Sequence, residues 1–149
     1  MLMTAAEYRE SLRRYQPRVF INGRQVDRVA DEPLLAPGIA AVGVTYDFAC
    51  NPGHAALLTA TQGTSGKQVN RMLHINQSAT DLLHKLEAVR LVCAESGCAQ
   101  RYLSQDGLNA LFQSTQLTDA NHGTDYHPRF LDYLHDVQAR DLTLGVAMT

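Results

Sequence analysis

The sequence predicts a mainly α-helical domain with one early β-hairpin. Helix caps followed by apolar stripes recur along the 149 residues, and a strand–turn–strand pattern stands near the N-terminus. Hydrophobic residues make up 45% of the chain and charged residues 19%, a balance typical of a globular domain with a hydrophobic core. The length suits a single domain.

The first predicted helix begins after Thr4 and ends near Tyr15. Thr4 and Glu7 have the spacing of a capping box, in which each side chain bonds the backbone N–H of the other residue. Pro17 cannot continue the helix, because its ring lacks the N–H and clashes with the preceding turn. A hairpin is expected over residues 18–26, because their Asn-Gly dipeptide is the strongest short-range signal for a two-residue turn.

Three further helices are predicted from apolar residues at helical spacing. The first starts near Pro37, and its apolar positions are Ile39, Val42, Tyr46 and Ala49. The second starts after Ser78, and its core-facing positions are Leu82, Leu86, Val89 and Cys93. The third starts at Pro128, and its apolar positions are Phe130, Leu131, Leu134 and Val137. A shorter helical pattern covers residues 108–112. Residues 57–77 are expected to be extended or loop. Residues 119–126 are expected to form a polar loop.

Charge and cysteine usage restrict the possible partners and compartment. The formal net charge is −2, and the longest run of basic residues is Arg13-Arg14, which argues against nucleic acid or an anionic membrane as a partner. No apolar run approaches the roughly 20 residues of a membrane span, and the N-terminus lacks the pattern of a signal peptide. Three cysteines without a disulfide-framework spacing favour a reducing, cytoplasmic location.

Two local patterns suggest ligands but fit their consensus poorly. The stretch from Gly63 to Lys67 has two residues between its glycines, whereas a phosphate-binding loop needs four and a Ser or Thr after the lysine. We expect a turn there. His122, His127 and His135 are five and eight residues apart, whereas ligands on one helix are spaced by three or four. We therefore expect surface histidines and no metal site.

Two cysteines and their neighbours are the candidate site. Cys93 and Cys98 are five residues apart, which separates them by about 140° around a helix, so Cys93 is expected in the core. Cys98 and Tyr102 are four apart and would share one helical face, with Arg101 beside them. These three side chains could line a substrate pocket. The alternative is an ordinary helix end packed with a small residue and an aromatic one.

The order of several segments resembles one flavoprotein family. These segments are MLMTAAEYRESL, RVFINGRQV, GKQVNRM, QSATDL, GLNALF, HGTDYH and GVAMT. The family contains the oxygenase components of 4-hydroxyphenylacetate 3-monooxygenase and 4-hydroxybutyryl-CoA dehydratase, and the resemblance runs nearly end to end. It implies an acyl-CoA dehydrogenase-like N-terminal helical domain over residues 1–149. It also implies that a middle β-barrel and a C-terminal helical bundle, which builds an oligomer, complete the enzyme.

The same resemblance implies two different site patterns at the Cys98 region. The dehydratase has Cys-x-x-x-Cys there, as ligands of a [4Fe–4S] cluster, and the aromatic hydroxylases have Arg-x-x-x-Tyr, which holds the phenol. This sequence has Cys98 and Tyr102, the first residue of one pattern and the second of the other. A phenol is a poor ligand for such a cluster, so Cys98 would be a ligand only if a cluster were present. The hydroxylases have a histidine that helps deprotonate the phenol, and its position falls at or near Val146 here, which the resemblance places near the flavin.

These implications predict the N-terminal part of a two-component monooxygenase. In that function, FADH2 arrives from a separate flavin reductase, and a phenolic or related small molecule is hydroxylated by O2. Cys98, Arg101 and Tyr102 would contact the substrate. One alternative is a FAD-containing 4-hydroxybutyryl-CoA dehydratase- or isomerase-like enzyme with an incomplete iron–sulfur site. Another is a non-catalytic assembly or interaction domain.

Overall fold

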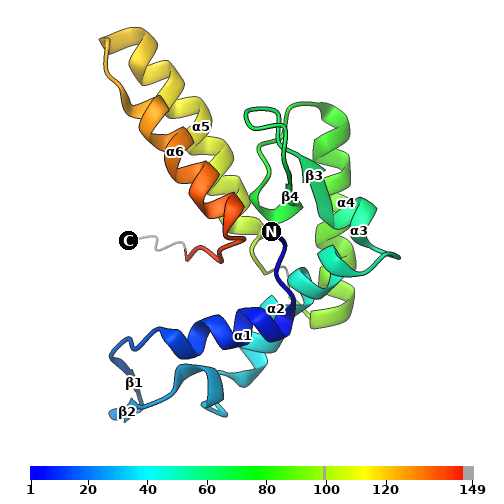
Figure 1. Cartoon of the computed structure of the whole chain (residues 1–149), viewed down its shortest axis with the longest axis vertical. Coiled ribbons are helices and arrows are strands. Elements are labelled where there is room, and N and C mark those ends of the chain that lie inside the picture. The colour runs from blue at the N-terminus through cyan, green and yellow to red at the C-terminus, as the bar shows by residue number, and fades with distance from the viewer. Residues whose placement is uncertain (99, 146–149) are drawn as a thin grey trace.

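The computed structural model describes residues 1–98 and 100–145, and their fold is mainly helical (Figure 1). The helices are α1 (Ala5–Arg14), α2 (Ala36–Cys50), α3 (Ala55–Leu58), α4 (Ala79–Ser96), α5 (Tyr102–His122) and α6 (Tyr126–Ala139). Two short 3-10 helices cover Val29–Asp31 and Arg71–Leu73. The strands are β1 (Val19–Ile21), β2 (Arg24–Val26), β3 (Thr59–Thr61) and β4 (Gln68–Asn70). The predicted fold class, including the early hairpin, is confirmed.

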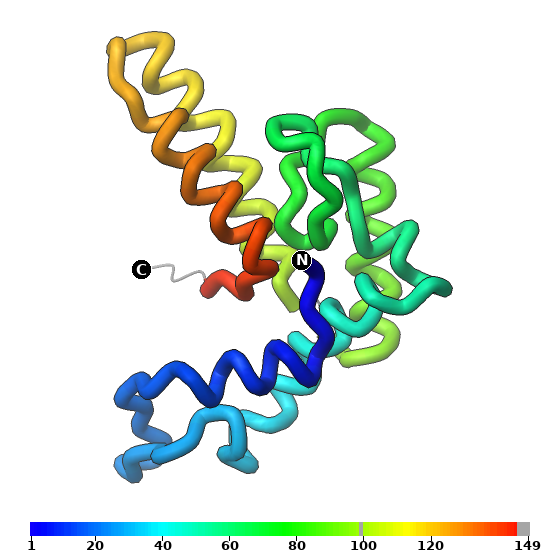
Figure 2. The backbone as a smooth tube through the Cα atoms, viewed as in Figure 1, coloured from blue at the N-terminus to red at the C-terminus, as the bar shows by residue number. Residues whose placement is uncertain are grey.

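Two arms extend from a central body. The tube in Figure 2 shows α1 and the β1–β2 hairpin forming one arm and the antiparallel pair α5 and α6 forming the other. The body contains α3, α4 and the β3–β4 hairpin, and α2 connects it with the first arm. The N-terminus lies near the centre, where the nitrogen of Met1 donates to the carbonyl of Ala139 (2.9 Å). In the part of the chain that is described, no helix has both the length and the apolarity that a bilayer crossing requires.

Both predicted N-terminal elements form for the expected local reasons. The backbone N–H of Glu7 donates to the Thr4 hydroxyl (3.2 Å), and the Thr4 N–H donates to the Glu7 carboxylate (2.7 Å). The hairpin turn places Asn22 at φ 50° and Gly23 at φ 77°. This left-handed conformation at both positions is the one that Asn-Gly favours in two-residue turns. The capping box and the hairpin are therefore as predicted.

Removing the Thr4 cap should destabilise α1. Thr4→Ala deletes the acceptor for the Glu7 N–H and breaks the reciprocal pair, so we expect the free energy of unfolding to fall by about 0.5–2 kcal/mol. Urea unfolding followed by circular dichroism measures this loss. Thr80→Ala, on the exposed first turn of α4, is the control. An equal loss in both variants would contradict the capping role.

The segment expected to be extended or loop contains a second hairpin. Strands β3 and β4 pair antiparallel, with Thr59 opposite Asn70 and Thr61 opposite Gln68. The stretch from Gly63 to Lys67 connects them, so it is a hairpin connection in this structure. The expectation missed α3 and the second 3-10 helix, which are only four and three residues long.

Helix α4 forms as predicted, but it buries a different face. Leu82 and Leu86 are 47% and 56% exposed, whereas Lys85, Ala88 and Val92 are buried. The helix is thus rotated by about one residue from the predicted stripe, because the small side chain of Ala88 faces the core beside α2 and α3. Lys85 is accommodated there by an ion pair with Asp106. The predicted core positions Leu82 and Leu86 are therefore wrong.

Residues 119–126 are more helical than the predicted loop. Helix α5 continues to His122, and α6 begins two residues before Pro128. Asp119 explains the short connection, because its carboxylate accepts the backbone N–H groups of Tyr126 (2.9 Å) and His127 (2.7 Å). A side chain on α5 thus supplies acceptors for the unsatisfied N–H groups that begin α6.

Two apolar clusters form the core. One joins α5 and α6 to the chain between β4 and α4, and consists of Leu73, Ile75, Leu108, Phe130, Leu134 and Val137. The other joins α2, α3 and α4, and consists of Ala49, Leu58, Met72, Ala88 and Val92. Tyr102 packs against this second cluster.

Gln62, His74 and Gln138 form a buried polar group. The side-chain oxygen of Gln62 accepts the Ile75 N–H (3.1 Å) and the Gln138 amide (3.1 Å). Because the backbone N–H of Ile75 can only donate, that Gln62 atom must be oxygen, and His74, 3.1 Å away through Nδ1, must donate to it. The Nε2 atom of His74 then faces the carboxylate of Asp81 at 3.5 Å.

Protonation of His74 should oppose folding. Burial lowers the pKa of His74 below its ordinary 6.5, and the Asp81 carboxylate only partly offsets this. The folded protein therefore binds this proton less readily than the unfolded chain, and stability is lost as the pH falls below about 6.5. We expect the free energy of unfolding to fall between about pH 7 and pH 5, and less steeply in His74→Gln. His122→Gln, at the exposed end of α5, is the control, and an unchanged slope in His74→Gln would contradict the assignment.

Candidate functional site

The connection between α4 and α5 carries the predicted site residues. Helix α4 ends at Ser96, and Gly97 follows in the left-handed conformation (φ 75°). Helix α5 begins at Tyr102, after Arg101, which is also left-handed (φ 68°). Cys98 therefore lies outside both helices, and the expectation that Cys98 and Tyr102 share one helical face is wrong. The left-handed Gly97 ends the helix there, as glycine commonly does at this position.

Cys98 is half-buried, and its thiol lies near polar atoms of Ser96 and Gln100. It lies 3.8 Å from the carbonyl oxygen of Ser96, to which it donates, and 3.2 Å from the Gln100 amide nitrogen. The carbonyl of Cys98 accepts from the Ser96 hydroxyl (2.8 Å). Among residues 1–98 and 100–145, no three His, Cys, Asp or Glu side chains gather closely enough to hold a metal ion.

Tyr102 and Arg101 have different neighbours. The Tyr102 ring packs against the cluster of α2, α3 and α4, and its hydroxyl makes no hydrogen bond to any described residue. The Arg101 side chain is only 1% exposed and pairs with Asp141 (Nη2 to Oδ1, 2.9 Å). It also lies 4.3 Å from the centre of the Tyr46 ring. The assignment of these residues to a substrate pocket stays a prediction.

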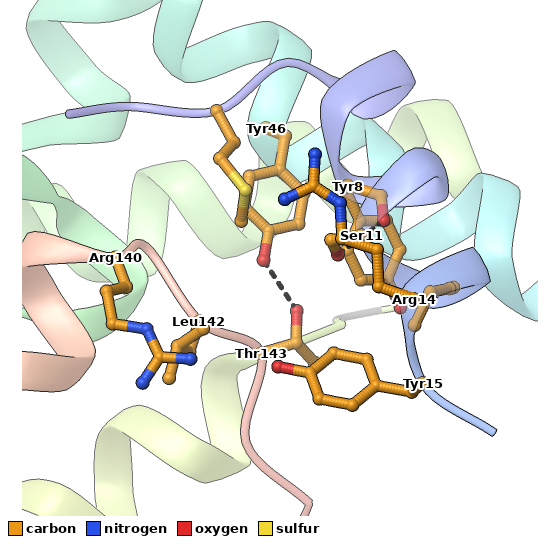
Figure 3. A pocket seen from close by; sticks show the side chains of 10 residues that line it. Tyr8, Ser11, Arg14, Tyr15, Tyr46, Arg140, Leu142 and Thr143 are labelled. Carbon is orange, nitrogen blue, oxygen red and sulfur yellow. Dashed lines mark hydrogen bonds between the residues drawn. The ribbon is translucent and has the colours of Figure 1, made fainter. Parts of the chain in front are cut away.

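A cavity of about 540 Å³ lies beside Tyr46, between α1, α2 and the segment after α6 (Figure 3). Its walls combine tyrosine rings, guanidinium groups, small hydroxyls and apolar side chains. Its lining residues are Met3, Tyr8, Ser11, Leu12, Arg14, Tyr15, Tyr46, Arg140, Leu142 and Thr143. We call it the tyrosine–arginine cavity. No pattern in the sequence indicated this cavity, because its residues come from three separate segments that only the fold brings together.

Two stacked tyrosines line the cavity. Tyr8 and Tyr46 stack with their ring centres 4.9 Å apart. The Tyr46 hydroxyl donates to the carbonyl of Asp141 (2.8 Å), so Thr143, at 2.8 Å, must donate to the phenol oxygen (Figure 3). Burial raises the pKa of both tyrosines, although the nearby Arg101 charge opposes this. Both phenols are therefore neutral hydrogen-bonding groups near pH 7.

The rim of the cavity is positive and partly apolar. Arg14 makes no hydrogen bond or ion pair with any described residue, and Arg140 forms only an exposed pair with Asp136 (3.1 Å). Tyr15 is 56% exposed beside them. Such a rim suits a ligand with a planar group and a negative charge.

The remaining predicted positions lie elsewhere. Val146 is outside the described residues. His127 contacts the Thr115 hydroxyl (3.0 Å) and His135 the Thr64 hydroxyl (3.1 Å), while His122 is exposed at the end of α5. The three histidines thus have separate surroundings.

A family model described as "4-hydroxyphenylacetate 3-hydroxylase N terminal" matches residues 4–149. A curated relative, the 4-hydroxybutyryl-CoA dehydratase/vinylacetyl-CoA-Δ-isomerase of Clostridium aminobutyricum, is 39% identical over the whole chain. The chain spans only 31% of that relative's length.

Solved structures agree with this match. An oxygen-tolerant archaeal 4-hydroxybutyryl-CoA dehydratase from N. maritimus superposes with a TM-score of 0.95 and 39% identity, over 100% of this chain and 30% of that one. The oxygenase component of 4-hydroxyphenylacetate 3-monooxygenase superposes with a TM-score of 0.75 and 20% identity, over 99% of this chain and 31% of that one. The second likeness concerns the fold alone.

Proposed function

Because the chain belongs to the 4-hydroxyphenylacetate 3-hydroxylase N-terminal family, we propose that it is the N-terminal domain of a flavin-dependent enzyme that acts on an acyl-CoA thioester. One observation carries the choice of substrate class. The chain is 39% identical to two 4-hydroxybutyryl-CoA dehydratases, with a TM-score of 0.95 to the one of known structure. The hydroxylase structures reach 20–21% and 0.75.

Within this class, we propose double-bond isomerisation as the reaction. The donor set does not fit the iron–sulfur cluster that the resemblance implies, because Tyr102 stands where a second cysteine is expected and a phenol is a poor cluster ligand. We therefore derive no step through a cluster. Isomerisation of a vinylacetyl-CoA-like substrate moves one proton from the α-carbon and delivers one to the γ-carbon. The double bond shifts to the α,β position, and the formula and oxidation state stay unchanged.

In this proposal the chain forms one wall of the active site. Tyr102 hydrogen-bonds the substrate, since its hydroxyl has no partner among the described residues, and Cys98 lines the same wall. The tyrosine–arginine cavity has rings and guanidiniums that suit a planar or anionic part of a flavin. Other domains would hold the rest of the cofactor and complete a homo-oligomer. When bound, FAD supplies a redox-active ring that the protein positions against the substrate.

A second candidate is the two-component monooxygenase. It is favoured by Tyr102, because the resemblance places a phenol-holding tyrosine at that position and this hydroxyl is available for such a bond. Reduced FAD would then come from a separate reductase. A purely structural or assembly role is the third candidate, and it requires no flavin.

Cofactor content and substrate choice test these alternatives. The full-length enzyme is purified without oxygen, and its flavin, iron and sulfide are measured. It is then assayed with vinylacetyl-CoA, with 4-hydroxybutyryl-CoA, and with 4-hydroxyphenylacetate plus FADH2 and O2. We expect bound flavin, little iron, and isomerisation of vinylacetyl-CoA without O2 or a reductase. About four iron and four sulfide per subunit with dehydration would overturn the isomerase proposal. Hydroxylation alone would favour the monooxygenase, and absence of flavin would leave the assembly role.

The role of Tyr102 gives a narrower prediction. Tyr102→Phe keeps the ring in its apolar cluster and removes only the hydroxyl, so we expect kcat/KM to fall by up to about tenfold while the fold is kept. Tyr133→Phe, on an exposed ring of α6, is the matched control. Equal kinetics for the wild type and Tyr102→Phe would show that this hydroxyl does not contact the substrate.

A further inference from the structure

We propose that Arg101 and Asp141 form a buried clamp that positions the α4–α5 connection against the segment after α6. Arg101 is then a positioning residue and makes no contact with substrate. The catalytic importance of these two segments rests on the proposed function, but the clamp itself rests on the contacts described below.

The guanidinium of Arg101 joins two segments that are far apart in the sequence. Its Nη2 atom donates to the carboxylate of Asp141 (2.9 Å) and to the carbonyl of Leu142 (3.1 Å). Its Nη1 atom lies 3.3 Å from the hydroxyl of Thr45 on α2. The side chain is 1% exposed, as is that of Asp141. A substrate would have to displace these partners to reach the guanidinium.

Asp141 makes two further contacts, one to the N-terminal segment and one to α2. Its second carboxylate oxygen accepts the N–H of Met3 (3.1 Å), which precedes α1. Its carbonyl accepts the hydroxyl of Tyr46 on α2 (2.8 Å). The ion pair therefore ties the N-terminal segment, α2, the α4–α5 connection and the segment after α6 at one buried point.

Both members of the pair have strained backbones. Arg101 has φ 68° and Asp141 has φ 47°, in the left-handed region that residues other than glycine rarely adopt. Each lies where the chain turns at a helix terminus. Such conformations persist where the surrounding contacts over-determine them, and the ion pair is the contact that both residues share. Without it, both turns would lose one of the interactions that fix them.

The rate at which the Cys98 thiol is alkylated indicates where the α4–α5 connection lies, and this measurement needs no substrate. Arg101 follows Cys98 by three residues and is the anchor between Gly97 and α5, so release of the clamp should expose Cys98. Cys93 is an internal reference, because it lies on α4 before the connection. Cleavage after Arg90 and after residue 101 yields a peptide that contains both thiols. Fragmentation of that peptide assigns iodoacetamide labelling to each.

The test uses the full-length enzyme with Asp141→Asn and Arg101→Lys. Asparagine tolerates the left-handed conformation and keeps the shape of Asp141, so this variant removes mainly the charge. Arg101→Lys keeps the charge and loses the forked contacts, and it serves if Asp141→Asn does not fold. Asp125→Asn is the matched control, because Asp125 forms an exposed ion pair with Arg129 (2.7 Å).

We expect alkylation of Cys98 to become about 10- to 100-fold faster in the clamp variants, with Cys93 and the control unchanged. Whichever reaction the enzyme catalyses, we expect kcat to fall by about 10- to 100-fold, because the clamp variants would misplace catalytic groups. We expect KM to change by less than about threefold. An unchanged Cys98 rate, or equal acceleration of both thiols, would overturn the clamp. A rise in KM without a change at Cys98 would also overturn it, by indicating a substrate contact. Absence of any activity would refute the proposed function and leave the thiol result to decide the clamp.

Discussion

Replacing Leu134 with alanine should lower the free energy of unfolding by about 2–5 kcal/mol. Leu134 is fully buried on α6, in the cluster that includes Leu73, Leu108 and Phe130. Those partners come from the 3-10 helix after β4, from α5 and from α6 itself. The substitution removes buried methyl groups and leaves a cavity where the arm of α5 and α6 joins the body, so little of the lost packing can be recovered by local collapse.

Urea unfolding measures this loss, and the slope of the transition should stay the same if only the native packing changes. Leu117→Ala is the control, since Leu117 is 62% exposed on α5. Leucine and alanine are both good helix formers, so the helix itself should be little affected. We expect the control to change stability by less than about 0.5 kcal/mol. Similar losses in the two variants would mean that this cluster does not anchor the arm.

Local signals in the sequence predicted the elements that local interactions determine. The capping box of Thr4 and Glu7 and the Asn22-Gly23 turn each act within a few residues, so their pattern is sufficient to place α1 and the first hairpin. The Ser78 cap likewise placed α4, whose Asp81 N–H donates to the Ser78 hydroxyl (3.1 Å). Burial is different, because it depends on which neighbour faces the helix. The leucines of α4 lie outward for this reason, although their spacing is regular.

The candidate site was the least predictable part. A continuous helix would bring Cys98 and Tyr102 to one face, but the left-handed Gly97 and Arg101 interrupt it. A glycine in the sequence indicates that a helix can end there, whereas an arginine gives no indication that its backbone will be left-handed. The guanidinium of Arg101 bonds Asp141, 40 residues away, and no local pattern indicates that contact. The tyrosine–arginine cavity depends on the same long-range arrangement of Tyr46 and the segment after α6.

Asp141→Ala should be among the most destabilising substitutions in the chain. It leaves the Arg101 guanidinium buried without its carboxylate, and breaking one side of a buried pair costs about 3–5 kcal/mol. It also leaves the Met3 N–H without its acceptor and places alanine where φ is 47°. Asp141→Asn separates these contributions, because asparagine tolerates that conformation and can still accept one hydrogen bond.

The exposed pair of Asp125 and Arg129 supplies the comparison. Its side chains are 69% and 68% exposed, although its distance of 2.7 Å is as short as that of the buried pair. Water already solvates both charges there, so Asp125→Ala should cost no more than about 1 kcal/mol. Urea unfolding of the three variants should therefore rank Asp141→Ala as least stable, then Asp141→Asn, then Asp125→Ala. If Asp125→Ala and Asp141→Ala lost equal stability, burial would not be what makes the Arg101 pair important. The clamp would then have no energetic basis, because its effect on the α4–α5 connection depends on the cost of burying the Arg101 guanidinium without its carboxylate partner.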